Sequence, residues 1–338
     1  MKYRVFWLLS FCLLQTCAIA QAGIRINLVP VAKTDVDYLK YLRFASVPPD
    51  RRKGEVWDSG NDVTNKTAAE IAAIVNAIKR LEADAVRKEI VQKMMNSNEL
   101  FSFRTVADLD ANVVLRLKAC EKMRDMNTRQ FYWYDTPKMT TAPEWMNPDG
   151  EVFLFRQVKG PTYTAVVSLC DGSNKTNGEC YGAIQACIWW GSSQALGEAA
   201  FNKRHPGAAD LRMSSGGSGH VLASADKSTL IPGDWLYMQN YNYGDIIKSE
   251  KAKKNSLLKP GSDYNYQGEN ALYIGDSKFE GLGIDASTEA EMREVLRTTY
   301  NKHFKPLIDK NQIPPLPAGA IADRLIIFRA DSYRRITN

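Results

Sequence analysis

Histidine is scarce in this sequence, which has three in 338 residues: His205, His220 and His303. No two of them have the spacing of metal ligands, and neither an HExxH motif nor a CxxC pair occurs, so the sequence argues against a zinc enzyme. A Walker-type phosphate loop and a G-x-S-x-G nucleophile elbow are also missing. The absence of the phosphate loop argues against a nucleotide-dependent enzyme.

A strong excess of one charge is missing too. There are 44 basic and 38 acidic side chains, which gives a formal charge of +6, and no long block of Lys and Arg occurs. Electrostatics therefore gives no case for nucleic-acid binding. Hydrophobic residues make up 44% and charged residues 24%, a composition typical of a globular protein of one large or two small domains.

No apolar run is long enough to cross a bilayer, which needs about 20 apolar residues. The apolar run at 5–14 follows Lys2 and Arg4 and precedes alanines with the spacing of a cleavage site. Residues 1–22 are therefore predicted to be a secretory signal peptide. We expect the mature protein to be secreted or periplasmic, with no membrane partner.

Removal of that segment leaves four cysteines, Cys120, Cys170, Cys180 and Cys187. An oxidising compartment allows disulfides, and four cysteines permit three full pairings. A bridge between Cys120 and Cys170 is one candidate. The sequence leaves even odds between a bridge from Cys180 to Cys170 or Cys187 and a free Cys180 thiol. Cys187 lies on an apolar helical stripe, so we expect it in the core.

The order of the predicted elements indicates an α+β fold. Hydrophobic periodicity and capping signals predict helices at 67–81, at 106 to about 123, from about 179, and at about 288–303. Strands are predicted at 235–239, 270–274, about 279–284 and 325–328, and short strands or loops from 150 to about 179. We expect a helical N-terminal region, 23–130, packed on a core formed by 131–338.

Cys180 is the strongest candidate for chemistry, because it stands where a polar loop ends and a helix begins. Free N–H groups at a helix start stabilise a thiolate and can hold an oxyanion, and papain-type enzymes place their nucleophile in this way. Its proton acceptor is less obvious, since His220 and His303 are both expected at the surface. Glu179 and Glu269 are the alternatives, because burial can raise the pKa of a carboxyl group and make it a base.

Four passages carry a resemblance to a known family. They are Glu179–Cys180 followed by 196–202, then 232–240, 266–276 and 281–284, with a weaker fifth at 329–336. The most specific is Gln-Gly-Glu-Asn at 267–270 with Pro-Gly-Asp at 232–234. From about residue 120 onward, the chain resembles the histidine-poor bacterial transglutaminases of spore coats, which are protein-glutamine γ-glutamyltransferases.

The resemblance implies a papain-like (NlpC/P60-type) single-domain cysteine acyltransferase core with no cofactor and no metal. It also implies a free Cys180 as the nucleophile, Glu269 as its main partner and Glu179 as a secondary partner. In the implied reaction the thiolate attacks a protein glutamine, a thioester forms, and a lysine amine takes the acyl group to give an isopeptide crosslink. Where the family carries a histidine, this sequence has Glu280 or Leu282.

Transfer to an amine needs a channel that excludes water. The aromatic candidates for its walls are Trp189, Trp190, Trp235, Tyr237, Tyr264, Tyr266 and Tyr273. Of these, Trp189, Trp235 and Tyr266 are the predicted substrate-binding residues, although core packing is the expected role for most of the set. The expected partners are proteins with accessible Gln and Lys, and the expected state is a monomer.

Two other functions stay open from the sequence. The first is an exported papain-like cysteine protease, amidase or glutamine deamidase, in which water is the acceptor. The second is an inactive binding module with Cys180 in a disulfide. No acidic EF-hand-type loop is present, so calcium dependence is not expected.

Overall fold

The computed structural model describes residues 42–44, 68–96, 101–103, 106–133, 145–146, 155–157, 159–206, 212–213, 219–221, 230–239, 268–311, 315–316 and 324–330. The predicted signal peptide and the aromatic residues Tyr264 and Tyr266 lie outside these ranges. The chain divides into two compact units, residues 1–110 with 337–338 and residues 111–336. No helix within the described ranges is both long and apolar enough to cross a membrane.

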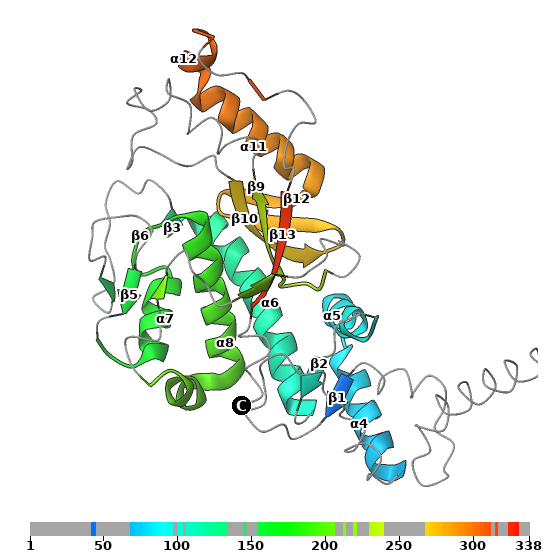
Figure 1. The fold of residues 1–338 in the computed structure, drawn as a ribbon. Coiled ribbons are helices and arrows are strands. Elements are labelled where there is room, and N and C mark those ends of the chain that lie inside the picture. The colour runs from blue at the N-terminus through cyan, green and yellow to red at the C-terminus, as the bar shows by residue number, and fades with distance from the viewer. Residues whose placement is uncertain are drawn as a thin grey trace, which may run out of the picture. The chain divides into compact units, whose positions relative to one another are not determined.

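Before Val106, the described residues of the first unit form two helices and a two-stranded parallel sheet (Figure 1). They are α4 (Ala68–Leu81), α5 (Ala85–Asn96), β1 (Leu42–Phe44) and β2 (Phe101–Phe103). The helix predicted at 67–81 is confirmed, and its apolar stripe buries Val75 and Ile78. No helix was predicted at α5, because its charged residues leave only a short apolar stripe in the sequence. Asp84 starts it by accepting from the backbone N–H of Arg87 at 2.8 Å.

A six-stranded sheet forms the centre of the second unit, and every neighbouring pair in it is antiparallel. In spatial order the strands are β12 (Ile284–Thr288), β11 (Lys278–Gly281), β10 (Gly268–Gly275), β9 (Trp235–Gln239), β13 (Arg324–Ala330) and β8 (Gly219–Val221). All four predicted strand regions are confirmed. The predicted piece at 279–284 is in fact two strands, β11 and the start of β12.

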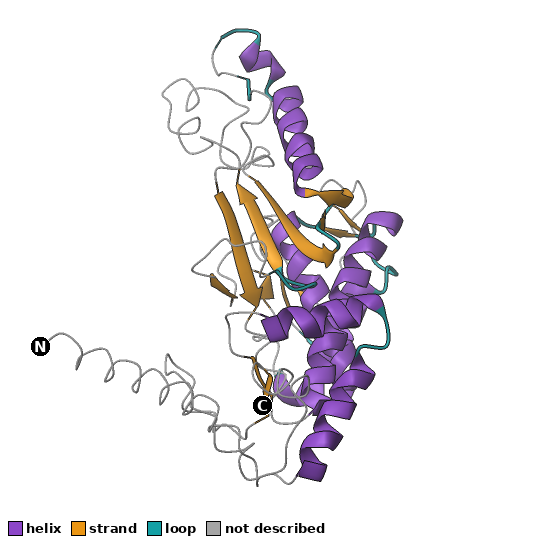
Figure 2. Ribbon diagram, turned by 90° about the vertical axis from the view of Figure 1, so that its right-hand side faces the viewer, coloured by secondary structure: helices purple, strands orange, loops and turns teal. Residues whose placement is uncertain are grey.

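Three helices pack together in this unit, and Figure 2 shows helices along one side of the sheet. They are α6 (Val106–Arg129), which begins in the first unit, α7 (Thr162–Cys170) and α8 (Cys180–Arg204). The helices predicted from 106 and from about 179 are confirmed. Gly191 allows close packing of α8 on α6, because a Cβ there would meet the backbone carbonyl of Leu115. A kink at Gly197, with φ of 74°, divides α8.

Helix α7 corrects the prediction of short strands or loops between 150 and 179. Its β-branched residues favour a strand locally, but Ala165, Val166 and Leu169 have helical spacing and lie in the core shared with α8. Its N-cap, Pro161, provides no side-chain bond. The side chain of Asn202 on α8 instead accepts from the backbone N–H of Tyr163 at 2.8 Å. Tertiary contacts therefore decide this segment, which local propensity cannot do.

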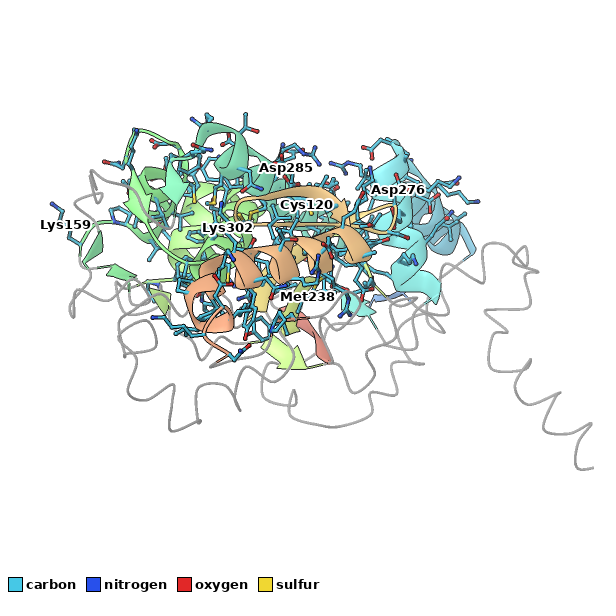
Figure 3. All side chains as sticks on the ribbon, turned by 90° about the horizontal axis from the view of Figure 1, so that it is seen from above. Cys120, Lys159, Met238, Asp276, Asp285 and Lys302 are labelled. Carbon is cyan, nitrogen blue, oxygen red and sulfur yellow. The ribbon has the colours of Figure 1, made fainter. Side chains whose placement is uncertain are left out.

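A second apolar cluster lies on the other face of the sheet, against α11 (Glu289–His303). Met238, which Figure 3 labels, packs there with Met292 and Leu296 of that helix. The predicted helix at 288–303 is confirmed, and Thr288 and Glu291 form a capping box at its start. Because strand side chains alternate, Trp235 and Leu272 join the first cluster on the α8 side.

The remaining elements are short. They are β3 (Tyr132–Trp133) paired parallel with β6 (Thr176–Asn177), the antiparallel set β4 (Trp145–Met146), β5 (Phe155–Gln157) and β7 (Arg212–Met213), and the single turn α12 (Lys305–Ile308). The second unit is thus a mixed fold of helices and an antiparallel sheet.

Candidate active site

The start of α8 presents a cysteine beside a carboxylate. Glu179 is the N-cap, and its side chain accepts from the backbone N–H groups of Tyr181 at 2.8 Å and Gly182 at 2.9 Å. Cys180 is the first residue of the helix, and its Sγ lies 3.5 Å from Glu179 Oε2. The prediction that Cys180 stands at a helix N-terminus is confirmed. The partial positive charge of that terminus therefore acts on both groups.

Strand β10 brings Asn270 to the same sulfur. The Nδ2 group of Asn270 donates to Cys180 Sγ at 3.2 Å, and both the side chain and the backbone of Asn270 lower the pKa of this thiol. The two residues are 90 positions apart in the chain. The packing of α8 on β10 is therefore what assembles the site.

Trp235, the first residue of β9, forms the next layer. Its indole Nε1–H donates to Asn270 Oδ1 at 2.8 Å. The ring of Tyr181 meets the Trp235 ring edge-on, with centroids 4.8 Å apart. Trp235 is only 4% exposed, so this contact is shielded from water.

Glu269 precedes Asn270 on β10 and is 9% exposed. The backbone groups of Asn270 and Leu282 lower its pKa, but Oε1 has no hydrogen-bond partner among the described residues. Gly281 leaves room for it, since a Cβ there would lie 2.9 Å from Oε1. Glu269 and Cys180 are close enough for the charge of one to act on the other, although no hydrogen bond joins them within the described part of the chain.

These groups shift one another's pKa values. Burial raises the pKa of the Cys180 thiol well above its ordinary value, and the charges of Glu269 and Glu179 raise it further, while Asn270 opposes the rise. Burial and the charge of Glu179 raise the pKa of Glu269 well above its ordinary value. Burial also raises the pKa of Glu179, against the two backbone bonds. The site therefore retains a proton at a pH where exposed carboxyls have lost theirs.

All four cysteines of the second unit are free thiols. The candidate bridge between Cys120 and Cys170 is absent, and Cys180 is not bridged to Cys170 or Cys187. The thiol of Cys120 faces Tyr273 O at 3.7 Å and that of Cys170 faces Ala186 O at 3.8 Å. Burial raises the pKa of each to about 12.

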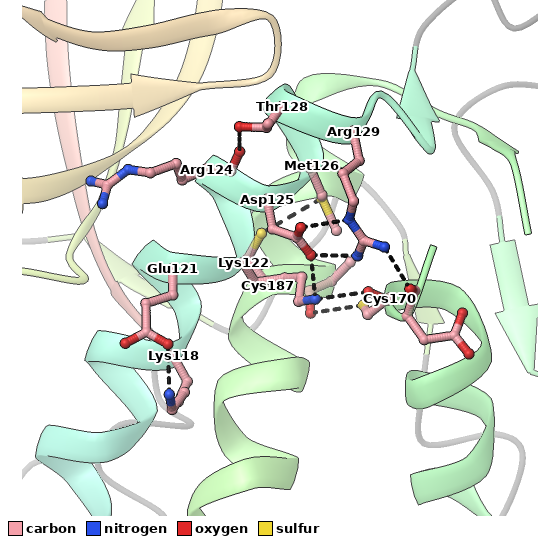
Figure 4. A network of polar contacts seen from close by, with 12 residues as sticks. Lys118, Glu121, Lys122, Arg124, Asp125, Met126, Thr128, Arg129, Cys170 and Cys187 are labelled. Atoms are coloured by element: carbon pink, nitrogen blue, oxygen red, sulfur yellow. Dashed lines mark hydrogen bonds and ion pairs between the residues drawn. The ribbon is translucent and has the colours of Figure 1, made fainter. Parts of the chain in front are cut away.

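Cys170 and Cys187 belong to a packed network between α6, α7 and α8 (Figure 4). Lys122 donates to Cys170 O at 2.8 Å and to Asp125 Oδ2 at 2.7 Å, and its ammonium lies 4.1 Å from the centroid of Trp190. Cys187 lies 3.7 Å from the sulfur of Met126. The expectation that Cys187 is a core residue is confirmed.

The two positions expected to replace the family histidine have different surroundings. Glu280 on β11 is buried, and its Oε2 lies 3.7 Å from Arg124 Nε. Burial raises its pKa, and its charge raises the pKa of the Cys120 thiol. The backbone of Leu282 lowers the pKa of Glu269.

The predicted aromatic residues are dispersed. Trp189 is buried in the α6–α7–α8 core, whereas Tyr273 packs on the α11 face of the sheet, and Trp235 adjoins Cys180 through Asn270. Asn270 was not predicted as a site residue, although it lies in the Gln-Gly-Glu-Asn passage. No group of His, Cys, Asp or Glu among the described residues is arranged to hold a metal ion.

Comparison with known proteins identifies the family of the chain. The family model for protein-glutamine gamma-glutamyltransferase matches residues 66–306. The chain is 23% identical over 254 residues to the protein-glutamine gamma-glutamyltransferase of Bacillus pumilus, covering 73% of this chain and 88% of that protein. It is 23% identical over 216 residues to that of Halalkalibacterium halodurans, covering 63% of this chain and 69% of that protein.

Among solved structures, the transglutaminase from Geobacillus stearothermophilus without its C-terminal extension aligns with a TM-score of 0.47 and 16% identity, over 69% of this chain and 98% of that one. The family match spans well over half of the chain and includes both Cys180 and Glu269. The chain belongs to the protein-glutamine gamma-glutamyltransferase family.

Proposed function

We propose that this protein is a protein-glutamine γ-glutamyltransferase that uses Cys180 as its nucleophile. The observation that carries this function is a cysteine at the first position of α8, held between Glu179 and Asn270 and close to the buried Glu269, in a chain that belongs to this family. An exposed structural cysteine would not be surrounded by two carboxyl groups with raised pKa values.

Glu269 is the proposed proton acceptor for the thiol. Both oxygens of Glu179 are bonded by the backbone at the start of α8, which favours its ionised form and weakens it as a base. Glu269 Oε1 lacks such a partner among the described residues, and burial raises its pKa. The Glu269 carboxylate is therefore the stronger base, and Glu179 acts as the secondary partner by fixing the helix start beside the sulfur.

The first half of the reaction forms a thioester. The thiol proton passes to Glu269, and the Cys180 sulfur attacks the side-chain carbonyl carbon of a protein glutamine. The partial positive charge of the α8 N-terminus stabilises the developing oxyanion, while the N–H groups of Tyr181 and Gly182 are held by the Glu179 side chain. As the carbon–nitrogen bond breaks, the proton returns to the departing nitrogen and ammonia leaves.

The second half transfers the acyl group. A lysine amine of another protein attacks the thioester carbon, its proton passes to the carboxylate and then to the sulfur, and an isopeptide bond remains. Water competes at this step and would give glutamate. Trp189, Trp235 and Tyr266 are the residues we propose for contacts with the substrates, and of these Trp235 lies in the layer next to the sulfur.

The wider setting is also a proposal. The core is papain-like, because a cysteine at a helix start faces an antiparallel sheet that bears its acid–base partner. The segment 1–22 supports export, so the protein acts as a secreted or periplasmic monomer on proteins with accessible Gln and Lys, without cofactor, nucleic acid or membrane.

Amine incorporation tests the function directly. The mature protein is incubated with a glutamine-bearing protein and a labelled primary amine, and incorporation and ammonia release are both measured. Incorporation that is lost in Cys180→Ala and kept in Cys187→Ala is the expected result. Ammonia release without incorporation would instead identify a deamidase or amidase. An absence of both, together with no reaction of Cys180 with iodoacetamide, would refute the proposal.

A further inference from the structure

We propose that Asn270 is a further catalytic residue, which donates its side-chain amide to the Cys180 sulfur, and that Trp235 is a positioning residue that fixes the orientation of this amide. The chain of contacts runs from Trp235 Nε1 to Asn270 Oδ1 at 2.8 Å and from Asn270 Nδ2 to Cys180 Sγ at 3.2 Å. The inference relies on the proposed function only for the identity of Cys180 as the nucleophile.

The orientation of the amide follows from hydrogen-bond chemistry. An indole N–H can only donate, so the Asn270 group that faces Trp235 must be the carbonyl oxygen. The NH2 group must then face Cys180, where it is a donor to sulfur. Asn270 is 6% exposed and Trp235 is 4% exposed, so little water competes for either bond. With the opposite orientation of the amide, an acceptor would face the thiolate and the indole N–H would face an NH2 group.

The aromatic packing holds Trp235 itself. Its ring meets Tyr181 edge-on, at an interplanar angle of 64°. Tyr181 follows Cys180 on α8, whereas Trp235 begins β9 and Asn270 lies on β10. The indole therefore connects the helix that carries the nucleophile with the strand that carries its donor. This arrangement sets the distance between sulfur and amide by packing rather than by a flexible side chain.

The electrostatic setting explains why such a donor matters. The two charged groups that act on the thiol, Glu269 and Glu179, are both acidic and favour its neutral form. The side-chain amide of Asn270 donates to the sulfur at 3.2 Å and favours the thiolate, and the backbone of Asn270 also lowers the pKa of the thiol. A substitution of the side chain removes the first contribution and leaves the second. We therefore expect a partial loss of thiolate, and a hydrogen bond to a charged group is worth about 10- to 100-fold in the equilibrium.

Alkylation of Cys180 provides a readout that does not depend on acyl transfer. The rate of reaction with iodoacetamide is measured from pH 6 to 10, and the modified Cys180 peptide is quantified by mass spectrometry, which separates it from Cys120, Cys170 and Cys187. The variants are Asn270→Leu, Asn270→Asp and Trp235→Phe. The control is Asn202→Leu, which removes a partly buried asparagine that bonds the start of α7 instead.

For Asn270→Leu we expect a shift of the alkylation profile to higher pH and a rate at pH 8 that is about 10- to 100-fold lower. Asn270→Asp keeps the shape and the bond to Trp235 but places a third carboxylate near the sulfur, so its rate should fall further. Trp235→Phe keeps an aromatic ring but loses the N–H together with part of the indole, so about a twofold to tenfold decrease is expected from an amide that is free to reorient. Amine incorporation should fall in the same order.

Several results would overturn the inference. One is a wild-type alkylation profile in folded Asn270→Leu or Asn270→Asp, and another is a Trp235→Phe profile equal to that of wild type. A profile shift of the same size in Asn202→Leu would show a general loosening of the fold. If Asn270→Leu does not fold, the nearly isosteric Asn270→Asp decides. A wild-type protein that fails to incorporate amine but shows the expected alkylation series would refute the proposed function and leave this inference standing.

Discussion

Replacing Arg116 by Met should destabilise the second unit strongly, because Arg116 and Asp234 form an ion pair with both side chains at 0% exposure. Arg116 Nη1 lies 2.9 Å from Asp234 Oδ1 and 3.2 Å from Pro232 O, and Nε donates to Asn112 Oδ1 at 3.0 Å. Asp234 Oδ2 also accepts from the backbone N–H of Ile231 at 3.0 Å. The pair connects α6 to the turn that leads into β9.

The size of the effect follows from what is left behind. Arg116→Met removes the cation and leaves a buried carboxylate, and breaking a buried pair in this way costs about 3–5 kcal/mol. That loss is a large share of the roughly 5–15 kcal/mol by which a domain is stable. Adding Asp234→Asn neutralises the orphaned charge and keeps an acceptor for Ile231. The double variant should therefore be more stable than Arg116→Met by at least about 1 kcal/mol.

Urea denaturation of the wild type, Arg116→Met, Asp234→Asn and the double variant gives the coupling energy between the two side chains. Lys305→Met is the matched control, because Lys305 pairs with Asp309 at 2.9 Å while their side chains are 69% and 57% exposed. An exposed helix pair of this kind is worth about 0–1 kcal/mol. If Arg116→Met costs no more than Lys305→Met, or if Asp234→Asn adds to its loss, the reasoning is refuted. Asp234 directly precedes Trp235, so amine incorporation should fall with stability.

Three further predictions concern packing, reactivity and pH. Gly191→Val should lower the free energy of unfolding by at least about 1–3 kcal/mol in urea denaturation, because its Cβ would meet the α6 backbone; an unchanged midpoint would contradict the packing. Cys170 in the native protein should alkylate far more slowly than Cys180, since it is fully buried and its pKa is about 12; equal labelling by mass spectrometry would contradict this. Glu269→Gln should raise the free energy of unfolding at pH 8 and bring little change near pH 4.5. Because the pKa of Glu269 is raised in the folded protein, its protonated form gives stability that is fully present below the ordinary pKa of 4.5. That stability is lost as pH rises through the pKa of the folded state, and glutamine, which carries no charge, avoids the loss. Urea midpoints at both pH values check this, and a lower midpoint at pH 8 would oppose it.

Local signals in the sequence predicted the parts of the fold that local chemistry decides. The periodic stripe of α4, the capping box before α11 and the strand β9 lie where the sequence places them. Cys180 was predicted at a helix start because a polar loop gives way there to an apolar stripe. Glu269 was one of two carboxyl candidates from the sequence, and only the resemblance to the family singled it out as the main partner, since nothing local marks a carboxyl group that becomes buried.

The features that escaped prediction depend on contacts between distant segments. Arg116 and Asp234 are 118 positions apart, and each reads locally as an ordinary surface charge. Asn270 reaches Cys180 because α8 packs on β10, and strand alternation predicts only that it lies on the face opposite to Glu269. The candidate bridge between Cys120 and Cys170 does not form, since a count of cysteines carries no geometry and both thiols face backbone carbonyls.

Because two carboxyl groups surround one thiol, Glu269→Gln should change the rate of Cys180 alkylation and the rate of amine incorporation in opposite directions. Passing the Cys180 proton to Glu269 leaves the total charge of the site unchanged, whereas losing it to water adds a negative charge beside Glu179. Since the charge of Glu269 raises the pKa of the thiol, its removal should increase the thiolate fraction and speed alkylation by iodoacetamide at pH 8. Amine incorporation should nevertheless fall about 10²- to 10⁴-fold, because no group is left to take up and return the proton. If alkylation and incorporation fall together, Glu269 acts on the thiol by fixing its position and not as a base.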